Sequence, residues 1–181
     1  MPTTLSRSFL VIILPGVVAA APWLLIISSR LQGFSEFYRE YQLVVNACLF
    51  AFVVIVGSLF EGVNSHLEIK WDKEREKEYG VEKNWYDYLA LVCNAEPVGF
   101  KYIARMVTLM YFELSMMLAS VLFGTGVLVL LVSHAMPCWA VMLTALLTVA
   151  APLYFWWQAK CSHEVLCRCR KELNDRLCKD G

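Results

Sequence analysis

Charged residues are scarce in this sequence, and the two signs cancel. Only 18% of the 181 residues are charged, and 16 Lys and Arg residues balance 16 Asp and Glu residues. A chain without net charge has no overall field that would draw DNA, RNA or an acidic ligand to it. The hydrophobic share of 59% and the mean hydropathy of +0.54 also exclude a disordered chain. We expect no direct binding to nucleic acid.

The patterns of the common catalytic and cofactor sites are missing too. The sequence contains no Gly-x-Ser-x-Gly, no phosphate-binding loop, no Gly-x-Gly-x-x-Gly and no Glu-x-x-His pair. Cys161, His163, Cys167 and Cys169 suggest zinc at first sight, and His163 shares a helical face with Cys167. Cys167 and Cys169, however, diverge by about 200° on a continuous helix, so zinc requires a non-helical tail. We therefore predict no metal, no cofactor and no enzymatic activity.

Four long apolar segments stand in place of these motifs. They cover residues 9–27, 43–60, 106–132 and 138–157, with Glu113 as their single charge. At about 1.5 Å of rise per residue, each segment can cross a hydrocarbon layer of roughly 30 Å as a helix. Helices are required because backbone amides in lipid need partners within their own segment. We predict an all-α polytopic membrane protein with four transmembrane helices.

Basic residues are distributed unevenly around these segments. The N-terminus, the loop between the second and third segments and the tail carry 14 Lys and Arg residues, whereas the other two connections carry only Arg30 and Arg39. Because basic loops stay on the cytoplasmic side, both termini are expected in the cytoplasm. The first apolar run continues past Pro22 to Ile27, so we expect an uncleaved span rather than a secretory signal.

The apolar segments divide the chain into four parts. Residues 1–60 hold the first two transmembrane helices and an external loop, where aromatic residues at helical spacing predict a short interfacial helix. Residues 61–105 form a cytoplasmic helical hairpin, and residues 106–157 hold the third and fourth transmembrane helices. Residues 158–181 continue the fourth helix as an amphipathic cytoplasmic tail.

The cytoplasmic hairpin has the clearest local signals. No proline interrupts residues 43–79, a helix of roughly 55 Å that would project about 25 Å beyond the lipid. Gly80 is expected to stop this helix, and Asn84 to cap a second one over residues 85–95. Because two short helices have little core of their own, the hairpin should lean on neighbouring copies or on a partner protein.

Five polar residues are candidates for an intramembrane or pore-lining role. Glu113 is the most unusual, because an ionisable group in an apolar segment costs about 2–3 kcal/mol and by default faces a bundle interior or water. Antiparallel packing of the second and third helices would bring Glu61 towards Arg105 and Glu113. Thr144 and Thr148 form a faintly polar stripe on the fourth helix. The alternatives are a carboxylate that fixes helix packing and hydroxyls that satisfy their own backbone.

Four further residues are candidates for binding a partner. Glu68 and Asp72 share a helical face with Glu61, and this acidic strip could attract cations or contact a basic partner. A merely solvated helix surface is the favoured alternative for both. Trp85 and Tyr88 belong to the apolar stripe of the second cytoplasmic helix, which must pack against something.

These features leave three classes of function open. Four helices without a polar interior cannot enclose a water pathway, so a pore would form only between copies. The leading prediction is an oligomeric channel or membrane-permeabilising effector controlled by a cytoplasmic signal or partner. The alternative is a non-conducting anchor or sensor scaffold for a cytoplasmic protein. An intramembrane proton-coupled carrier or enzyme is least favoured, because inverted repeats and broken helices are not evident.

In architecture, the whole chain resembles the small four-pass membrane subunits of bacterial anti-phage defence systems. The resemblance implies a location in the bacterial inner membrane and a cytosolic sensor that controls the membrane component. It rests on the arrangement of segments rather than on a motif, so it assigns no residue a role.

Overall fold

The structure, a computed structural model, describes residues 7–31, 33–90 and 98–177, apart from the side chains of residues 86, 88–90, 98–100 and 176–177. Every element in these ranges is helical, which confirms the all-α prediction for them. Four of the helical stretches are long and apolar enough to cross a membrane. In chain order the elements are η1 (Phe9–Ile13, a π-helical turn), α2 (Leu14–Arg30), α3 (Phe34–Glu40), α4 (Gln42–Tyr79), α5 (Val81–Ala90), α6 (Val98–Ser133) and α7 (Cys138–Leu177).

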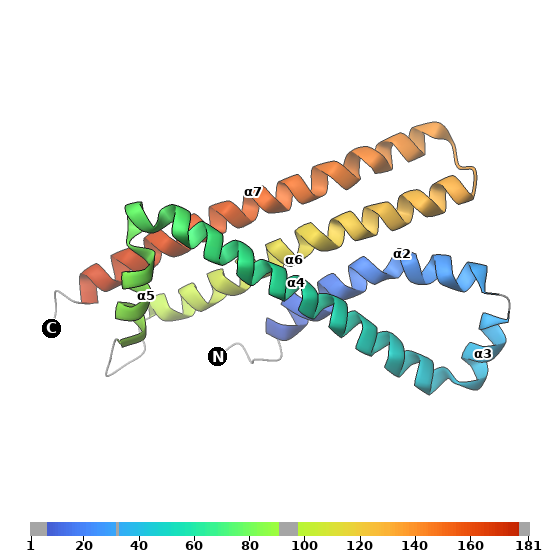
Figure 1. The fold of residues 1–181 in the computed structure, drawn as a ribbon, viewed down its shortest axis with the longest axis horizontal. Coiled ribbons are helices and arrows are strands. Elements are labelled where there is room, and N and C mark those ends of the chain that lie inside the picture. Colours follow the sequence, from blue (N-terminus) through green and yellow to red (C-terminus); the bar gives the residue numbers. More distant parts are fainter. Residues whose placement is uncertain (1–6, 32, 91–97, 178–181) are drawn as a thin grey trace.

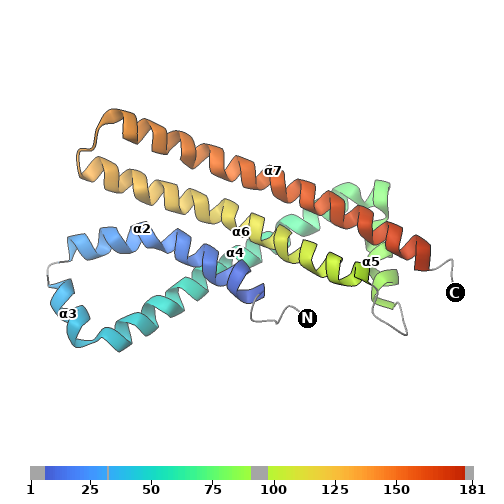
Figure 2. The ribbon, with the colours of Figure 1, turned by 180° about the vertical axis from the view of Figure 1, so that it is seen from behind.

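A long antiparallel hairpin of α6 and α7 forms one side of the molecule (Figure 1). α2 lies along α6, whereas α4 crosses α2 and η1 and then diverges from α2 towards α3 (Figures 1 and 2). α3 and the α6–α7 turn lie at one end of the molecule, and α5 and the last turns of α7 lie at the other. The short helix expected in the external loop is present as α3.

Glycine permits the close crossing of α4 over η1 and α2. A Cβ atom added to Gly57 would lie 2.1 Å from the carbonyl oxygen of Ile12, and one added to Gly16 would lie 2.3 Å from that of Val53. Small residues of this kind let helix backbones approach closely where lipid supplies no hydrophobic driving force between helices. The crossing therefore depends on the missing side chains.

α4 confirms the long projecting helix but not the predicted start of the next one. It has 38 residues and ends at Gly80, whose φ of 57° is the left-handed conformation common at helix ends. α5 begins immediately at Val81, so Asn84 lies inside it and is not its cap. The Asn84 side-chain amide instead donates to the carbonyl oxygen of Tyr79. The residues beyond Ala90 that were expected to complete this helix lie outside the described ranges.

The main core lies where α4, α6 and α7 pack together, at the ends of their apolar segments and beyond them. Its buried members come from all three helices: Trp71, Ile103, Met110, Leu114, Ala159 and Leu166. Cys169 and Leu173 of the amphipathic tail pack against it, so this chain's own helices cover part of the tail's apolar face. The Asn174 amide of α7 also donates to the carbonyl oxygen of Asn84 over 2.8 Å. The hairpin thus packs on the 40-residue α7 of its own chain, while its expected contact with other copies or with a partner protein stays a prediction.

Candidate functional site

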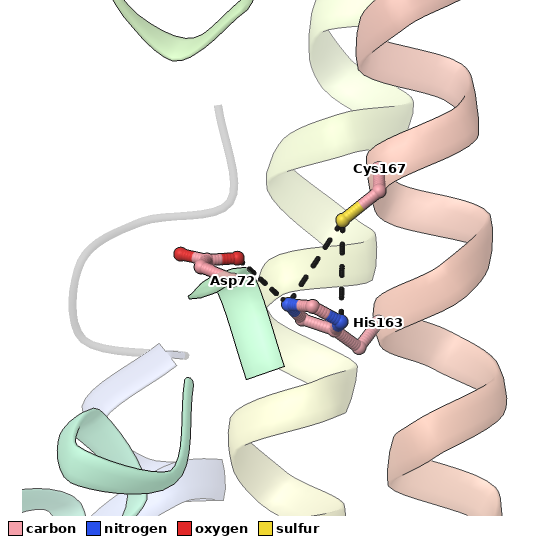
Figure 3. Close-up of side chains that lie close together, drawn as sticks. All are labelled: Asp72, His163 and Cys167. Atoms are coloured by element: carbon pink, nitrogen blue, oxygen red, sulfur yellow. Dashed lines mark hydrogen bonds and ion pairs between the residues drawn. The ribbon is translucent and has the colours of Figure 1, made fainter. Parts of the chain in front are cut away.

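Polar side chains from α4 and α7 meet beyond the apolar runs of these helices. Asp72 and Arg75 come from α4, about one turn apart, and His163 comes from α7. The apolar run of α4 ends before Glu61, and that of α7 ends at Trp157. The long projections of both helices therefore create this junction, of which Figure 3 shows Asp72 and His163.

His163 is the centre of the junction and is only 1% exposed. Its Nε2 atom lies 2.9 Å from Oδ1 of Asp72, and its Nδ1 atom lies 2.8 Å from Nη1 of Arg75. Because a guanidinium can only donate, Nδ1 accepts from Arg75, and Nε2 carries the proton that it donates to Asp72. The ring of Trp71 packs edge-on against the imidazole, with the centroids 5.5 Å apart. These contacts hold the imidazole in one orientation and one tautomer.

Arg75 has a second set of partners on α7. Its Nη2 atom lies 3.3 Å from the carbonyl oxygen of Lys160 and 3.4 Å from Oε2 of Glu164. The Glu164 side chain is exposed, so this ion pair adds little stability by itself. With these two partners, the Arg75 guanidinium can move away from His163 and still keep contacts with α7.

Cys167 lies one turn after His163 and is buried. Its Sγ atom is 3.9 Å from both ring nitrogens of His163 (Figure 3). Burial, assisted by the Asp72 carboxylate, raises the pKa of the thiol to about 11. Cys167 stands about ten residues, or roughly 15 Å of helix, beyond Trp157. With Asp72 and His163 it forms a group whose potential metal-ligating atoms all lie within 4.8 Å of one another.

An open pocket of about 590 Å³ adjoins this group and shares Asp72 with it. Residues of α4, α5 and α7 line the pocket, and Trp85 of α5, 39% exposed, is among them. The guanidinium of the buried Arg170 lies 4.6 Å from the centre of the Trp85 ring. Carboxylates outnumber cations in the lining by four to two: Glu68, Asp72, Glu76 and Glu82 against Lys73 and Arg170.

Three of the four candidate partner-binding residues line this pocket together: Glu68, Asp72 and Trp85. Glu68 also accepts a hydrogen bond from the hydroxyl of Tyr111 on α6. Glu68 and Asp72 therefore contact neighbouring helices, which argues against the interpretation of a merely solvated helix face. The side chain of Tyr88 lies outside the described residues.

Glu113 is buried between α6 and α7, with 3% of its surface exposed. The Ser162 hydroxyl donates to its Oε2 atom over 2.7 Å. About 20 residues separate Glu113 from the end of α6 at Ser133, which is roughly 30 Å of helix and the whole thickness of a hydrocarbon layer. Glu113 lies seven residues inside the apolar run of residues 106–132, and its bond to Ser162 joins α6 to α7.

The other pore candidates do not assemble into one polar face. Among the described residues, neither Glu61 nor the exposed Arg105 forms an ion pair with Glu113. The hydroxyl of Thr148 donates to the carbonyl oxygen of Thr144 over 2.7 Å, so it satisfies the backbone of its own helix. The Glu61–Arg105–Glu113 cluster considered from the sequence is thus not formed.

Several residues of the site have no signal in the sequence. Asn64 is fully buried and donates to the hydroxyl of Ser115 over 2.7 Å. In the sequence alone it is indistinguishable from the other polar residues that follow the apolar run of α4. His163 and Cys167 lie on one face of α7, but the described part of α7 supplies no third metal-ligating side chain beside them. Asp72 supplies it from α4, 91 residues before His163 in the chain. Spacing along a single helix cannot reveal such a partner.

Comparisons with protein-family models, with curated proteins and with solved structures found no match to this chain. The fold and the site define a broad class. The chain is a helical protein with four helices able to span a membrane and a polar helical junction outside their apolar segments.

Proposed function

We propose that the chain is a membrane-anchored receptor whose acidic pocket binds a basic segment of a cytoplasmic protein. The observation that carries the proposal is the excess of carboxylates in the pocket of α4, α5 and α7. Carboxylates select Lys and Arg side chains by charge complementarity. The asymmetry of 14 to 2 basic residues supports a cytoplasmic location for this pocket and for both termini.

The receptor function corresponds to the non-conducting scaffold considered from the sequence. A pore between copies needs polar side chains that face another copy. Glu113 instead bonds to Ser162 of the same chain, and Thr148 bonds to its own helix. Under the resemblance to four-pass subunits of anti-phage defence systems, the basic segment would belong to a cytosolic sensor, and the membrane would be a bacterial inner membrane.

Neutralising two pocket carboxylates should weaken the binding of a basic peptide. With the full chain in lipid nanodiscs, we expect a labelled Lys- and Arg-rich peptide to bind, and the double variant Glu68→Gln/Glu82→Gln to bind it about tenfold more weakly. Fluorescence anisotropy at two salt concentrations measures both, because a charge-based contact weakens as salt rises. Glu74→Gln is the matched control, since Glu74 is exposed on α4 and lies outside the pocket lining.

Two outcomes would contradict the receptor proposal. One is equal binding of a Glu-rich peptide of the same length. The other is an equal loss of peptide binding in Glu74→Gln. That result would mean that the peptide responds to the overall charge of α4 and not to the pocket.

An oligomeric channel is the second candidate, and one observation favours it. No residue in the most apolar 18-residue window of α7 is buried within the chain. Large side chains such as Trp139, Met142 and Leu146 are exposed along it. Lipid or a second copy would cover this face, and several copies could then enclose a pore.

Ion flux separates the two candidates. We expect vesicles that contain the chain alone to conduct potassium no faster than empty vesicles, because Glu113 and Thr148 form their hydrogen bonds inside the chain. A flux assay in reconstituted vesicles measures this, with the copy number determined in detergent. Steady conductance in the absence of any partner would favour the channel and overturn the receptor proposal.

A further inference from the structure

We propose that Asp72, His163 and Cys167 bind a zinc ion that clamps α4 to α7. The carboxylate, imidazole and sulfur donors lie within 4.8 Å of one another (Figure 3). Zinc bonds of about 2.0 Å to nitrogen and oxygen and 2.3 Å to sulfur set tetrahedral donors roughly 3.3–3.5 Å apart. The Nε2 to Oδ1 separation is 2.9 Å and the Nε2 to Sγ separation is 3.9 Å. The three donors, which all lie within 4.8 Å of one another, would therefore have to move by up to about 1 Å, which side-chain rotation can supply.

The donor set selects zinc by its chemistry. Imidazole and thiolate are preferred ligands of zinc, whereas magnesium and calcium prefer oxygen donors alone. The negative charges of the Asp72 carboxylate and the Cys167 thiolate balance one Zn²⁺ ion. Asp72 also lines the open pocket, from which a water molecule can take the fourth position.

Zinc would replace the proton that His163 now donates to Asp72. The Nε2 proton passes through solvent to Nδ1, so the imidazole stays neutral and binds the metal through Nε2. The Cys167 thiol releases its proton to water and binds as a thiolate. One proton is thus released for each zinc ion bound, without any oxidant or reductant.

Arg75 must leave Nδ1 in this exchange, because a protonated nitrogen cannot accept from a guanidinium. Its Nη2 atom already lies 3.3 Å from the Lys160 carbonyl oxygen and 3.4 Å from Glu164. The guanidinium can therefore turn to these partners. The zinc group beside it carries no net charge, so it does not repel the cation.

Cobalt substitution tests the site directly. The full chain is purified in detergent, stripped with a chelator and titrated with Co²⁺, whose thiolate charge-transfer band and tetrahedral d–d bands report sulfur ligation. We expect saturation at one cobalt per chain, displacement by Zn²⁺ and a higher unfolding midpoint with zinc. Cys167→Ser should abolish the charge-transfer band and weaken zinc binding about 100-fold or more.

Cys161→Ser is the matched control, because Cys161 is exposed on the same helix, outside the ligand group. It should leave the cobalt spectrum and the zinc affinity unchanged. A stripped wild-type chain that shows no charge-transfer band overturns the proposal, and so does a band that persists in Cys167→Ser. The wild-type titration decides the matter even if a ligand variant fails to fold. The result does not depend on whether the acidic pocket binds a basic peptide.

Discussion

Glu113→Lys is expected to break the packing of α6 on α7 and to lower the free energy of unfolding by about 3–5 kcal/mol. The Glu113 carboxylate is almost fully buried and accepts from the Ser162 hydroxyl. Lysine would place an ammonium group, which cannot accept a hydrogen bond, in the same enclosed position. The buried ammonium charge would then have no anionic partner to offset its desolvation. Unfolding in mixed micelles, followed by circular dichroism, measures the change.

Glu113→Gln is the matched control, because its side-chain oxygen can still accept from Ser162. We expect it to change the free energy of unfolding by less than about 1 kcal/mol. If the lysine variant were as stable as the glutamine variant, Glu113 would not face α7.

Gly57→Leu should separate α4 from η1 and α2 and lower the free energy of unfolding by about 3 kcal/mol. Even the first side-chain atom would meet the backbone oxygen of Ile12 at 2.1 Å, and backbone cannot rotate out of the way as a side chain can. The helices must therefore move apart, and the contacts of α4 with η1 and α2 are lost with them. The same unfolding measurement in micelles reports the loss.

Gly62→Leu provides the control within the same helix. A Cβ atom at Gly62 has nothing within 4 Å, so leucine should be accommodated and should strengthen helix formation slightly. Equal destabilisation by both substitutions would mean that α4 loses stability for a reason other than its crossing with η1. A disulfide between cysteines placed at the crossing would give an independent measure of its geometry.

Local sequence signals predict the helices of this protein well. The apolar runs at residues 43–60 and 138–157 recur within α4 and α7, and both helices continue past those runs. Gly80 ends α4 because it can adopt a left-handed conformation that other residues avoid. Asn84 shows the limit of such signals. A residue suited to a helix cap can equally well bond to the end of the preceding helix, and the turn at Gly80 decides between the two.

The sequence predicted some residues of the candidate site but not the contacts between them. Glu68 and Asp72 stand out as an acidic face, but a face is defined within one helix, and their bonds to Tyr111 and His163 join different helices. Glu113 stands out as a charge in an apolar run. Its contact with α7 becomes clear only from the bond to Ser162.

The amino-acid sequence by itself determined the four apolar helices and the uneven distribution of basic residues, because each depends on neighbouring residues along the chain. Only the tertiary structure decided which polar groups meet. It brought Asp72 to His163 across 91 positions and placed the hairpin on the chain's own tail. The physical reason is that contacts between helices depend on crossing angle and rotation, and these follow from packing such as that at Gly57, not from the periodicity of any single helix.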